Sequence, residues 1–585
     1  MDAKRVIGWI PRTAAEGLPV AATGVFTGVK KRSINMEQKK NRNWVPGIIL
    51  TALVLAAAVA FLAFLARMKM IPTKYLAVIA VIIGVLLLTV CLLMLNYRRK
   101  GRFLAGMLLS YVMIALFVLG SLYIHKTQST ITDISGVNTE VTQVSVFVRS
   151  EDPADSVQAT EGYTYGILAS LDRENTDGAI EHLKQEFGGE VTTMEYAGLT
   201  ELADGLLNSQ TGAIVLNKAY LSVIEEMDGY ADIESKIKEL GSVEVENVIE
   251  ANNESNATPV ETEKGGKIYT IYISGIDSRE GMVAKSRSDV NIIATVNTDT
   301  HQALLVSTPR DYFVPLSISG GQPDKLTHAG IYGIDVCMDT LGMLYDIDIN
   351  YYFRINFEGF VQIIDALGGI TVYSDYEFDS GNITGYHFNQ GENYVNGEQA
   401  LVFARERYAF QEGDRQRGKN QMAVIKGVVN KVLSTDLLAN YSSVLSSLQG
   451  CFSTNITYEE IAELLQEQLN KGGSWDIISY SVDGTGDTQK PYSMSQNAYV
   501  MVPDYNTVDK AKSLMQAVRD GQTITQEQAD AAIGSTTAGT AATDTTGTDA
   551  AATDMAGTDT AGADTAGQEG AVGADTAQTD SGQGQ

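Results

Sequence analysis

The stretch KIYTIYISGIDSR, residues 267–279, is typical of a strand that ends at Asp277. A loop follows, and RSDVNIIATVN then begins the next strand at Asp289. If the two strands pair as antiparallel neighbours, both carboxylates lie at the same end of the sheet. A third strand, QALLVST, returns to that end and is followed by Arg310. Each residue alone is ordinary turn chemistry, but the hairpin geometry gathers two carboxylates and a guanidinium.

A second stretch, ARERYAFQEGDRQRGKNQ at residues 404–421, contains four arginines and one lysine in a chain of formal net charge −28. The segment ALVFARER alternates like a strand, which would place Arg405 and Arg407 on one face and Glu406 on the other. The segment after it predicts a helix with Asp414 as its N-cap. The apolar stripe of that helix comprises Met422, Ile425, Val428, Val429 and Val432.

Arg417 and Gln421 are four residues apart and share one face of the first turns of this helix. Helix N-termini attract anions, and a guanidinium binds two phosphate oxygens at once. The stretch therefore indicates a phosphate-binding cradle. The alternative is a solvated run in which Glu406, Glu412 and Asp414 pair with the arginines. Carboxylates beside a phosphate suggest Mg²⁺ and phosphoryl transfer.

Three apolar runs near the N-terminus, residues 46–66, 75–95 and 103–124, are each long enough to cross a membrane as a helix. A buried soluble hairpin and a cleaved signal peptide both fit three consecutive runs poorly. Basic residues concentrate before the first run and between the second and third, whereas the intervening loop has only Arg67, Lys69 and Lys74. Positive-inside counting predicts a cell-membrane protein with a cytoplasmic N-terminus, residues 1–45, and an extracellular remainder. That location excludes nucleic acid as the partner of the arginines.

The remaining chain divides by composition. Residues 143–248 alternate between strand and helix patterns, which predicts a small α/β accessory domain that acts as a spacer or an interaction domain. Residues 249–267 are predicted to be a linker, and residues 268–520 a second domain. Residues 521–585 are dominated by Ala, Thr, Gly and Asp, which predicts a disordered acidic tail.

Over about residues 268–435 the chain resembles the LytR-CpsA-Psr family of cell-wall glycopolymer ligases. The resemblance lies in motifs such as LVSTPRDYFVPL, DKLTHAGIYG and GEQALVFARERYAFQEGDRQRGKNQ. It implies an α/β fold with a mixed central sheet flanked by helices and an apolar slot for a polyprenyl chain. It also implies Asp277 and Asp289 as a pair associated with Mg²⁺ (or Mn²⁺), and with Arg310 as catalytic residues. The implied pyrophosphate-binding residues are Arg287, Arg310, Arg405, Arg407, Arg417 and Gln421, with Lys325 as a further candidate.

The implied reaction moves a glycopolymer, such as a teichoic acid or a capsular polysaccharide, from undecaprenyl pyrophosphate to a peptidoglycan hydroxyl. It leaves a phosphodiester link and releases undecaprenyl phosphate, so the expected partners are the lipid-linked polymer, peptidoglycan and the lipid bilayer. The alternatives are a polyprenyl pyrophosphate phosphatase and a non-catalytic lipid-binding protein of wall assembly. A Ser-His-Asp hydrolase built on His328 is the weakest, because no serine lies in a nucleophile elbow.

Overall fold

The strands expected around residues 267–308 belong to one central sheet in the computed structural model. The described residues are 45–95, 99–136, 139–248, 259–263, 265–276, 285–411, 413–433, 444 and 451–531. Asp277, Glu412, residues 1–44, most of the predicted linker and residues 532–585 lie outside them.

The central sheet has seven strands, in the order β17-β12-β7-β8-β9-β18, with β6 paired to β7. Strands β7, β8 and β9 are antiparallel neighbours, as the sequence predicts. Strand β12 runs parallel to β7, and β18 runs parallel to β9, so the sheet is mixed. The bounds are β6 Val260–Glu261, β7 Lys267–Ile276, β8 Ser288–Asn297, β9 Gln302–Ser307, β12 Tyr351–Asn356, β17 Phe452–Thr454 and β18 Asp476–Ser481.

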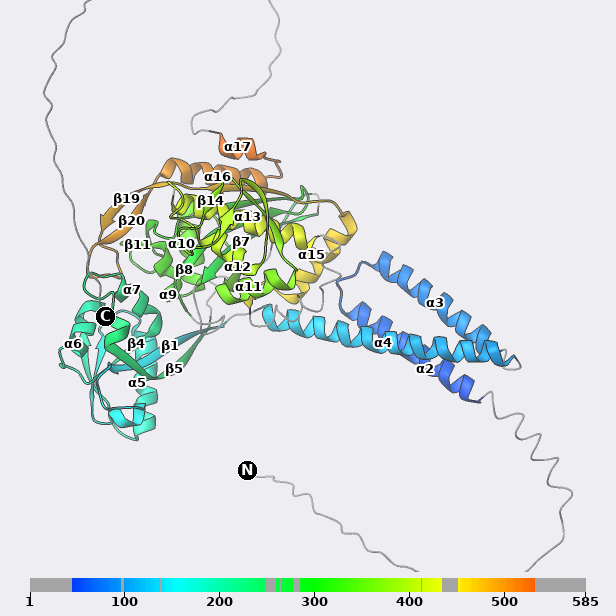
Figure 1. Cartoon of the computed structure of the whole chain (residues 1–585), viewed down its shortest axis with the longest axis horizontal. Coiled ribbons are helices and arrows are strands. Elements are labelled where there is room, and N and C mark those ends of the chain that lie inside the picture. Colours follow the sequence, from blue (N-terminus) through cyan, green and yellow to red (C-terminus); the bar gives the residue numbers. More distant parts are fainter. Residues whose placement is uncertain are drawn as a thin grey trace, which may run out of the picture. The chain divides into compact units, whose positions relative to one another are not determined.

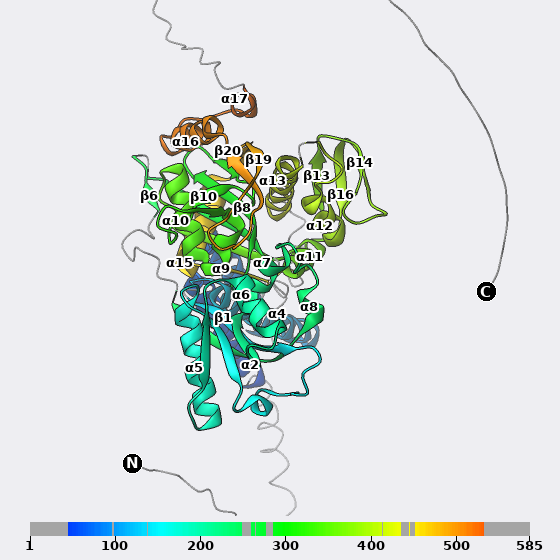
Figure 2. The same ribbon diagram turned by 90° about the vertical axis from the view of Figure 1, so that its left-hand side faces the viewer.

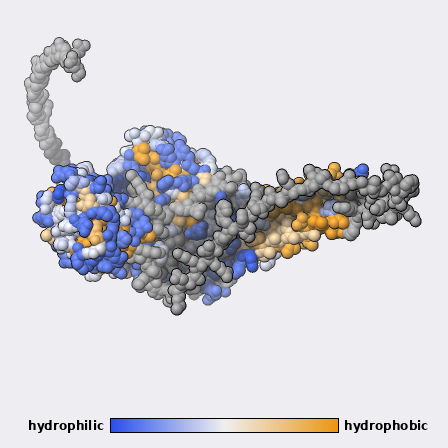
Figure 3. Space-filling model, turned by 90° about the horizontal axis from the view of Figure 1, so that it is seen from below, coloured by the Kyte–Doolittle hydropathy of each residue, from blue (hydrophilic) through white to orange (hydrophobic). Residues whose placement is uncertain are grey.

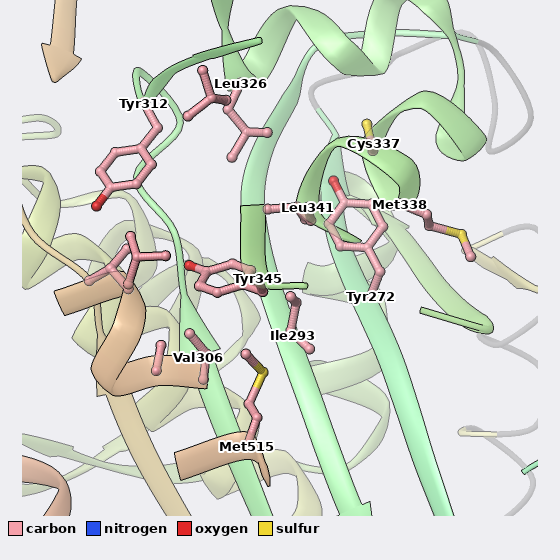
Figure 4. Packing of buried hydrophobic residues seen from close by; sticks show 14 of the residues in the cluster. Tyr272, Ile293, Val306, Tyr312, Leu326, Cys337, Met338, Leu341, Tyr345 and Met515 are labelled. Atoms are coloured by element: carbon pink, nitrogen blue, oxygen red, sulfur yellow. The ribbon is translucent and has the colours of Figure 1, made fainter. Parts of the chain in front are cut away.

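Helices cover both faces of this sheet because side chains alternate along each strand. Ile293 of β8 packs toward the helices α10 and α16, together with Tyr272 and Tyr345 (Figure 4). The adjacent Ile292 packs on the other face against Met422 of α13. The helices and their short neighbours are α9 Ala329–Tyr332, α10 Ile334–Tyr345, α13 Asp414–Val432, α15 Tyr458–Lys471, α16 Tyr505–Arg519, β10 Phe313–Pro315, β11 Pro323–Lys325, β19 Gly484–Gln489 and β20 Ala498–Pro503. The predicted fold class is thereby confirmed.

A smaller substructure lies beside α13 (Figure 2). It has its own apolar core, to which Ile364, Phe403 and Val424 contribute. Its elements are α11 Phe357–Ala366, β13 Ile370–Ser374, β14 Phe378–Asp379, β15 His387–Phe388, β16 Gly391–Val395 and α12 Gly397–Arg405. Helix α12 of this substructure contacts the neighbouring helix α13, and these two helices contain most of the arginine-rich stretch.

The strand predicted for ALVFARER is wrong, because residues 400–405 of this segment belong to the helix α12, Gly397–Arg405. Asn396 accepts a hydrogen bond from the N–H of Gln399, and the Gln399 side chain accepts one from the N–H of Asn396, which closes a capping box. Ala400, Phe403 and Ala404 are buried at helical spacing. A short apolar run fits either period, and the capping box decides for the helix.

The helix predicted after residue 413 is confirmed as α13, but its start differs by one residue. Gly413 is the N-cap, with a φ of 50°, and Asp414 is the first helical residue, so the N-cap predicted at Asp414 is wrong. At the far end of the chain, helix α17 Gln526–Asp530 is described beyond the boundary predicted at residue 520. Gln526 exchanges hydrogen bonds with the backbone of Ser479 in β18, so the folded part extends into the segment predicted as tail.

The predicted alternation over residues 143–248 is also found (Figure 1). We keep the name accessory domain for residues 139–248. Its five strands stand in the order β3-β2-β4-β1-β5, and the long edge strand β5 has no counterpart in the prediction. The bounds are β1 Thr139–Arg149, β2 Thr164–Leu168, α5 Arg173–Phe187, β3 Thr192–Tyr196, α6 Leu199–Leu207, β4 Ala213–Asn217, α7 Leu221–Glu225, α8 Ile233–Lys236 and β5 Ile237–Val248.

The three apolar runs form the helices α2 Val45–Arg67, α3 Thr73–Leu95 and α4 Lys100–Ile134. By length and composition all three could cross a membrane. Figure 3 shows apolar side chains along the outside of these helices, and Val81 and Leu104 are each about two-thirds exposed, at 67% and 69%. A surface of this kind needs a lipid environment, so the helices form a membrane anchor.

Candidate active site

One cavity of about 490 Å³ receives the predicted site residues from five elements of the fold. The start of β8, the loop after β9, the end of α12, the residues after it and the first turns of α13 meet there. Its polar lining includes Arg287, Asp289, Arg310, Arg405, Arg407, Arg417 and Gln421. Every predicted site residue that the structure describes is therefore part of this lining, except Lys325.

Asp289 and Arg310 lie together, as the hairpin geometry predicts, and the structure shows that they form an ion pair. The Arg310 guanidinium donates to Asp289 Oδ1 at 3.1 Å, and the Thr327 hydroxyl donates to the same oxygen at 3.3 Å. Burial alone would raise the pKa of Asp289, but the charges of Arg310, Arg287 and Arg417 outweigh it and lower that pKa. Asp289 is therefore a carboxylate at neutral pH.

Arg310 lies between two carboxylates, because its Nε atom is also 3.5 Å from Asp311 Oδ2. Burial works against the guanidinium charge, yet Asp289 and Asp311 raise the pKa of Arg310 above its usual value. The pKa of Asp311 is itself raised, chiefly by burial. Arg310 therefore stays charged. We call the part of the cavity that is lined by the five arginines its mouth.

Arg417 occupies the first turns of α13, where it is only 9% exposed. Its Nη2 atom is 3.2 Å from Asp414 Oδ1, and burial lowers the pKa of the guanidinium. Gln421 lies one turn further and donates to the carbonyl of Ala404 at 3.3 Å. This bond joins the start of α13 to the end of α12, so it links two segments of the arginine-rich stretch.

Arg405 and Arg407 reach the cavity from a helix end and from the residues that follow it, rather than from one strand face. The Arg405 guanidinium lies over the ring of Phe357, 4.6 Å from its centroid. Arg407 lies over Tyr408 and donates to its hydroxyl at 2.8 Å. Two aromatic rings thus orient two cations without neutralising them.

Glu406 is fully buried and does not pair with the arginines as the solvated-run alternative requires. It accepts hydrogen bonds from the Ser380 hydroxyl and from the N–H groups of Asn382, Tyr408 and Ala409. Asp414 does lie near Arg407 and Arg417, at 3.9 and 3.2 Å. The stretch therefore forms a structured site, in which Asp414 partly neutralises Arg407 and Arg417, and not a solvated run of charges.

The rest of the cavity is apolar. It is lined by Ile273, Phe353, Ile355, Phe357, Phe360, Ile363, Ile364, Leu401, Val424, Ile425, Val428 and Val429. Ile425, Val428 and Val429 belong to the stripe predicted on α13, whereas Met422 packs in the core and Val432 is 42% exposed. We call this apolar part of the lining the depth of the cavity. A lining that combines a cationic part with an apolar part suits an amphipathic molecule with an anionic head.

Lys325 is placed differently from the other predicted residues. It is 5% exposed and lies outside the cavity lining of the described residues. Its ammonium group is 2.6 Å from Glu226 and 3.7 Å from Asp311. Lys325 therefore does not line the described cavity, and its ammonium group pairs with Glu226 and Asp311 instead. Glu226, Thr327 and Phe357 have no role in the sequence prediction, because their contacts to the site are long-range.

His328 does not form a catalytic triad. Its Nδ1 atom lies 2.7 Å from Asp324 Oδ1 and 2.8 Å from Ser493 Oγ, so one nitrogen serves both partners. In a catalytic triad, one ring nitrogen of the histidine contacts the serine hydroxyl and the other ring nitrogen contacts the carboxylate. All three residues are also buried, so the hydrolase alternative has no geometric support.

The chemistry of Asp289 fits a divalent cation such as Mg²⁺. It is ionised, and both hydrogen bonds that it accepts from described side chains use Oδ1. Mg²⁺ takes carboxylate, phosphate and water oxygens. Among the described residues there is no cluster of three or more metal-ligating side chains, and Asp277 lies outside them.

The fold is a mixed α/β sheet that carries a cavity lined by arginines and apolar side chains, a lining suited to an amphipathic anion. Two independent similarities identify the family. The LytR_cpsA_psr family model matches residues 235–517. The polyisoprenyl-teichoic acid–peptidoglycan teichoic acid transferase TagU of Enterococcus faecalis is 34% identical over 220 residues, which are 37% of this chain and 71% of that protein. The chain therefore belongs to the LytR-CpsA-Psr family.

A second relative agrees with this membership. TagU of Bacillus subtilis is 32% identical over 219 residues, which are 37% of this chain and 69% of that protein. The crystal structure of Bacillus subtilis TagV is 26% identical and covers 44% of this chain and 99% of that chain, with a TM-score of 0.36.

Proposed function

We propose that this protein is a membrane-anchored transferase that moves a glycopolymer from undecaprenyl pyrophosphate to peptidoglycan. The observation that carries the proposal is one cavity whose lining combines five arginines with apolar side chains. A pyrophosphate suits the arginines, and a polyprenyl chain suits the apolar part. The TagU relatives carry the name of teichoic acid transferases, so a teichoic acid or a related anionic glycopolymer is the cargo we favour.

In the proposed reaction, a hydroxyl oxygen of peptidoglycan attacks the phosphorus that carries the polymer. The bond from this phosphorus to the bridging oxygen breaks, undecaprenyl phosphate leaves, and the hydroxyl proton passes to water. Arg310 and Arg417 lie at the mouth of the cavity, where their charges would stabilise the phosphoryl oxygens during transfer. Arg287, Arg405, Arg407 and Gln421 would bind the rest of the pyrophosphate.

Asp289, together with Asp277, would hold Mg²⁺ or Mn²⁺, and such an ion would neutralise phosphate charge during the reaction. The ionised state of Asp289 supports this role. Arg310 would keep the Asp289 carboxylate in place before the ion and the donor bind.

The proposed location is the outer face of the cell membrane. The distribution of basic residues around the three helices supports a cytoplasmic N-terminus and an extracellular site. An anchor in the same bilayer as the donor confines enzyme and substrate to two dimensions, which raises their encounter rate.

The test uses the full-length protein in lipid nanodiscs with a synthetic undecaprenyl pyrophosphate glycan and a peptidoglycan oligomer. Mass spectrometry should detect the oligomer with one glycan attached through a phosphodiester, together with undecaprenyl phosphate. An Arg310→Gln variant serves as the inactive control. If the wild type releases phosphorylated glycan without attaching it to the oligomer, the protein is a phosphatase and the proposal is wrong. Binding of the donor without any product would indicate a non-catalytic lipid-binding protein.

A further inference from the structure

The accessory domain packs directly onto the part of the chain that carries the cavity. Glu140 of β1 and Arg354 of β12 form an ion pair in which both side chains are almost fully buried. Tyr220 contacts the ring of Tyr332 edge-on, and Ile331 belongs to the same apolar cluster as the accessory residues. This shared core fixes the accessory domain in place, which a flexible spacer would not require.

Glu226 directly follows helix α7 of the accessory domain and extends toward the cavity. One of its carboxylate oxygens is 2.6 Å from the Lys325 ammonium. The other accepts a hydrogen bond from Nη1 of Arg287, which lines the cavity. The Glu226 carboxylate thus contacts two cations of the second domain. Arg287 lines the cavity, and Lys325 lies outside the described lining.

The charges around Glu226 largely balance one another. Arg287 and Lys325 are two cations, and Glu226 and Asp311, 3.7 Å from Lys325, are two carboxyl groups, so the cationic character of the cavity comes from its other arginines. Burial alone would raise the pKa of Glu226, but Lys325, His328 and Arg287 outweigh it and lower that pKa. The contact with Arg287 uses one nitrogen of a guanidinium that has five N–H donors in total. Glu226 can therefore fix the direction of Arg287 without consuming its capacity to bind phosphate oxygens.

We propose that Glu226 is a positioning residue through which the accessory domain orients Arg287 toward the anionic head of the lipid donor. This inference rests on the proposed function, because the head group it concerns is the pyrophosphate. An arginine has many rotamers, and holding one of them before the ligand arrives reduces the entropy lost on binding. The accessory domain then acts on donor affinity from outside the cavity.

The experiment compares Glu226→Gln with the matched control Asp228→Asn in the full-length protein in nanodiscs. The glutamine keeps the shape of the side chain but loses the charge, and its NH₂ group would face the Lys325 ammonium. Asp228 is exposed and contacts the second domain through its backbone, not its carboxylate. We expect Glu226→Gln to raise the KM for the donor about tenfold, the loss expected for one charge-assisted contact. Both variants should keep the kcat of the wild type, whereas Glu226→Gln should also lower the Tm because the buried Lys325 ammonium loses one of its two carboxylate partners.

A double-mutant cycle with Arg287→Gln tests whether Glu226 acts through Arg287. In the Arg287→Gln background, adding Glu226→Gln should raise the KM by less than about twofold, because the oriented group is gone. An equal tenfold rise in both backgrounds would overturn the inference. A lower KM in Glu226→Gln would also overturn it, since Glu226 would then mask Arg287 from the donor. An unchanged KM in Glu226→Gln would also overturn the inference.

A separate arm distinguishes failure of this inference from failure of the proposed function. If the wild type transfers nothing, the proposed function fails. Calorimetric titration of the same proteins with inorganic pyrophosphate then replaces the KM. Weaker binding by Glu226→Gln than by Asp228→Asn supports the positioning role, and equal binding overturns it.

Discussion

Individual arginines in this site differ in what orients them, and this predicts different tolerance to lysine. Arg405 lies on the Phe357 ring, and Arg407 lies on the Tyr408 ring. Lysine keeps the charge but loses the planar face and the fork of donors. We therefore expect Arg405→Lys and Arg407→Lys to lower the transfer rate by about 10²–10³, the usual cost of losing one oriented donor to a transition-state charge.

Arg415 provides the matched control for these two variants. It belongs to the same stretch but lies outside the described lining of the cavity, and its Nη1 atom is 3.0 Å from Asp483. Arg415→Lys should keep most of the activity in the same transfer assay. Equal and modest losses in all three variants would show that the stretch acts only as an electrostatic patch.

Asp289 predicts a specific pH dependence of stability. Its folded-state pKa lies below its ordinary value of about 4. Its ion pair therefore contributes stability that is fully present above about pH 4 and is lost as the pH falls through the lower, folded-state pKa. The Tm difference between the wild type and Asp289→Asn should be constant from pH 5 to 8 and should shrink below about pH 4. A difference that grows on acidification would contradict this assignment.

At the level of elements, successive turns of helix α13 contribute to both the cationic and the apolar lining of the cavity. Its first turns present Arg417 and Gln421, and its next turns present Ile425, Val428 and Val429 to the apolar depth. The head and the chain of an amphipathic ligand would thus both contact helix α13. The bond from Gln421 to Ala404 joins this helix to α12.

This arrangement predicts that Val428→Trp discriminates between donors of different chain length. The indole would fill part of the 490 Å³ cavity. The KM for an undecaprenyl donor should rise at least about tenfold, roughly 1.4 kcal/mol of lost binding, whereas a donor with a two-isoprene chain should be little affected. Val432→Trp is the control on the same helix, because Val432 is 42% exposed and lies outside the described lining. Equal effects on both donors would place the polyprenyl chain elsewhere.

For the whole molecule, the orientation in the membrane decides which substrates the cavity can meet. The basic-residue distribution predicts that everything after α4 is extracellular. A single cysteine introduced at Ser581, in a chain with Cys91, Cys337 and Cys451 replaced by alanine, should react with a membrane-impermeant maleimide in intact cells. A cysteine introduced at Asp2 should react only after permeabilisation. The opposite pattern would remove the wall-side function.

The sequence by itself determined the antiparallel order of β7, β8 and β9, and with it the meeting of Asp289 and Arg310. It also determined the three apolar helices. Both follow from local rules, because side-chain period and short connections constrain neighbouring elements. Such rules were insufficient for ALVFARER, where a short apolar run fits both a strand and a helix.

Only the tertiary structure decided the contacts between distant segments. Phe357 beneath Arg405, Glu406 inside a loop, and Glu226 on Arg287 all join residues from separate elements. The tertiary structure also shows that Lys325 lies outside the described cavity lining, where it pairs with Glu226. The physical reason is that burial and ion pairing depend on which surfaces meet when the chain packs. The local pattern of residues predicts whether a segment forms a helix or a strand, but it does not predict which distant segment packs against it.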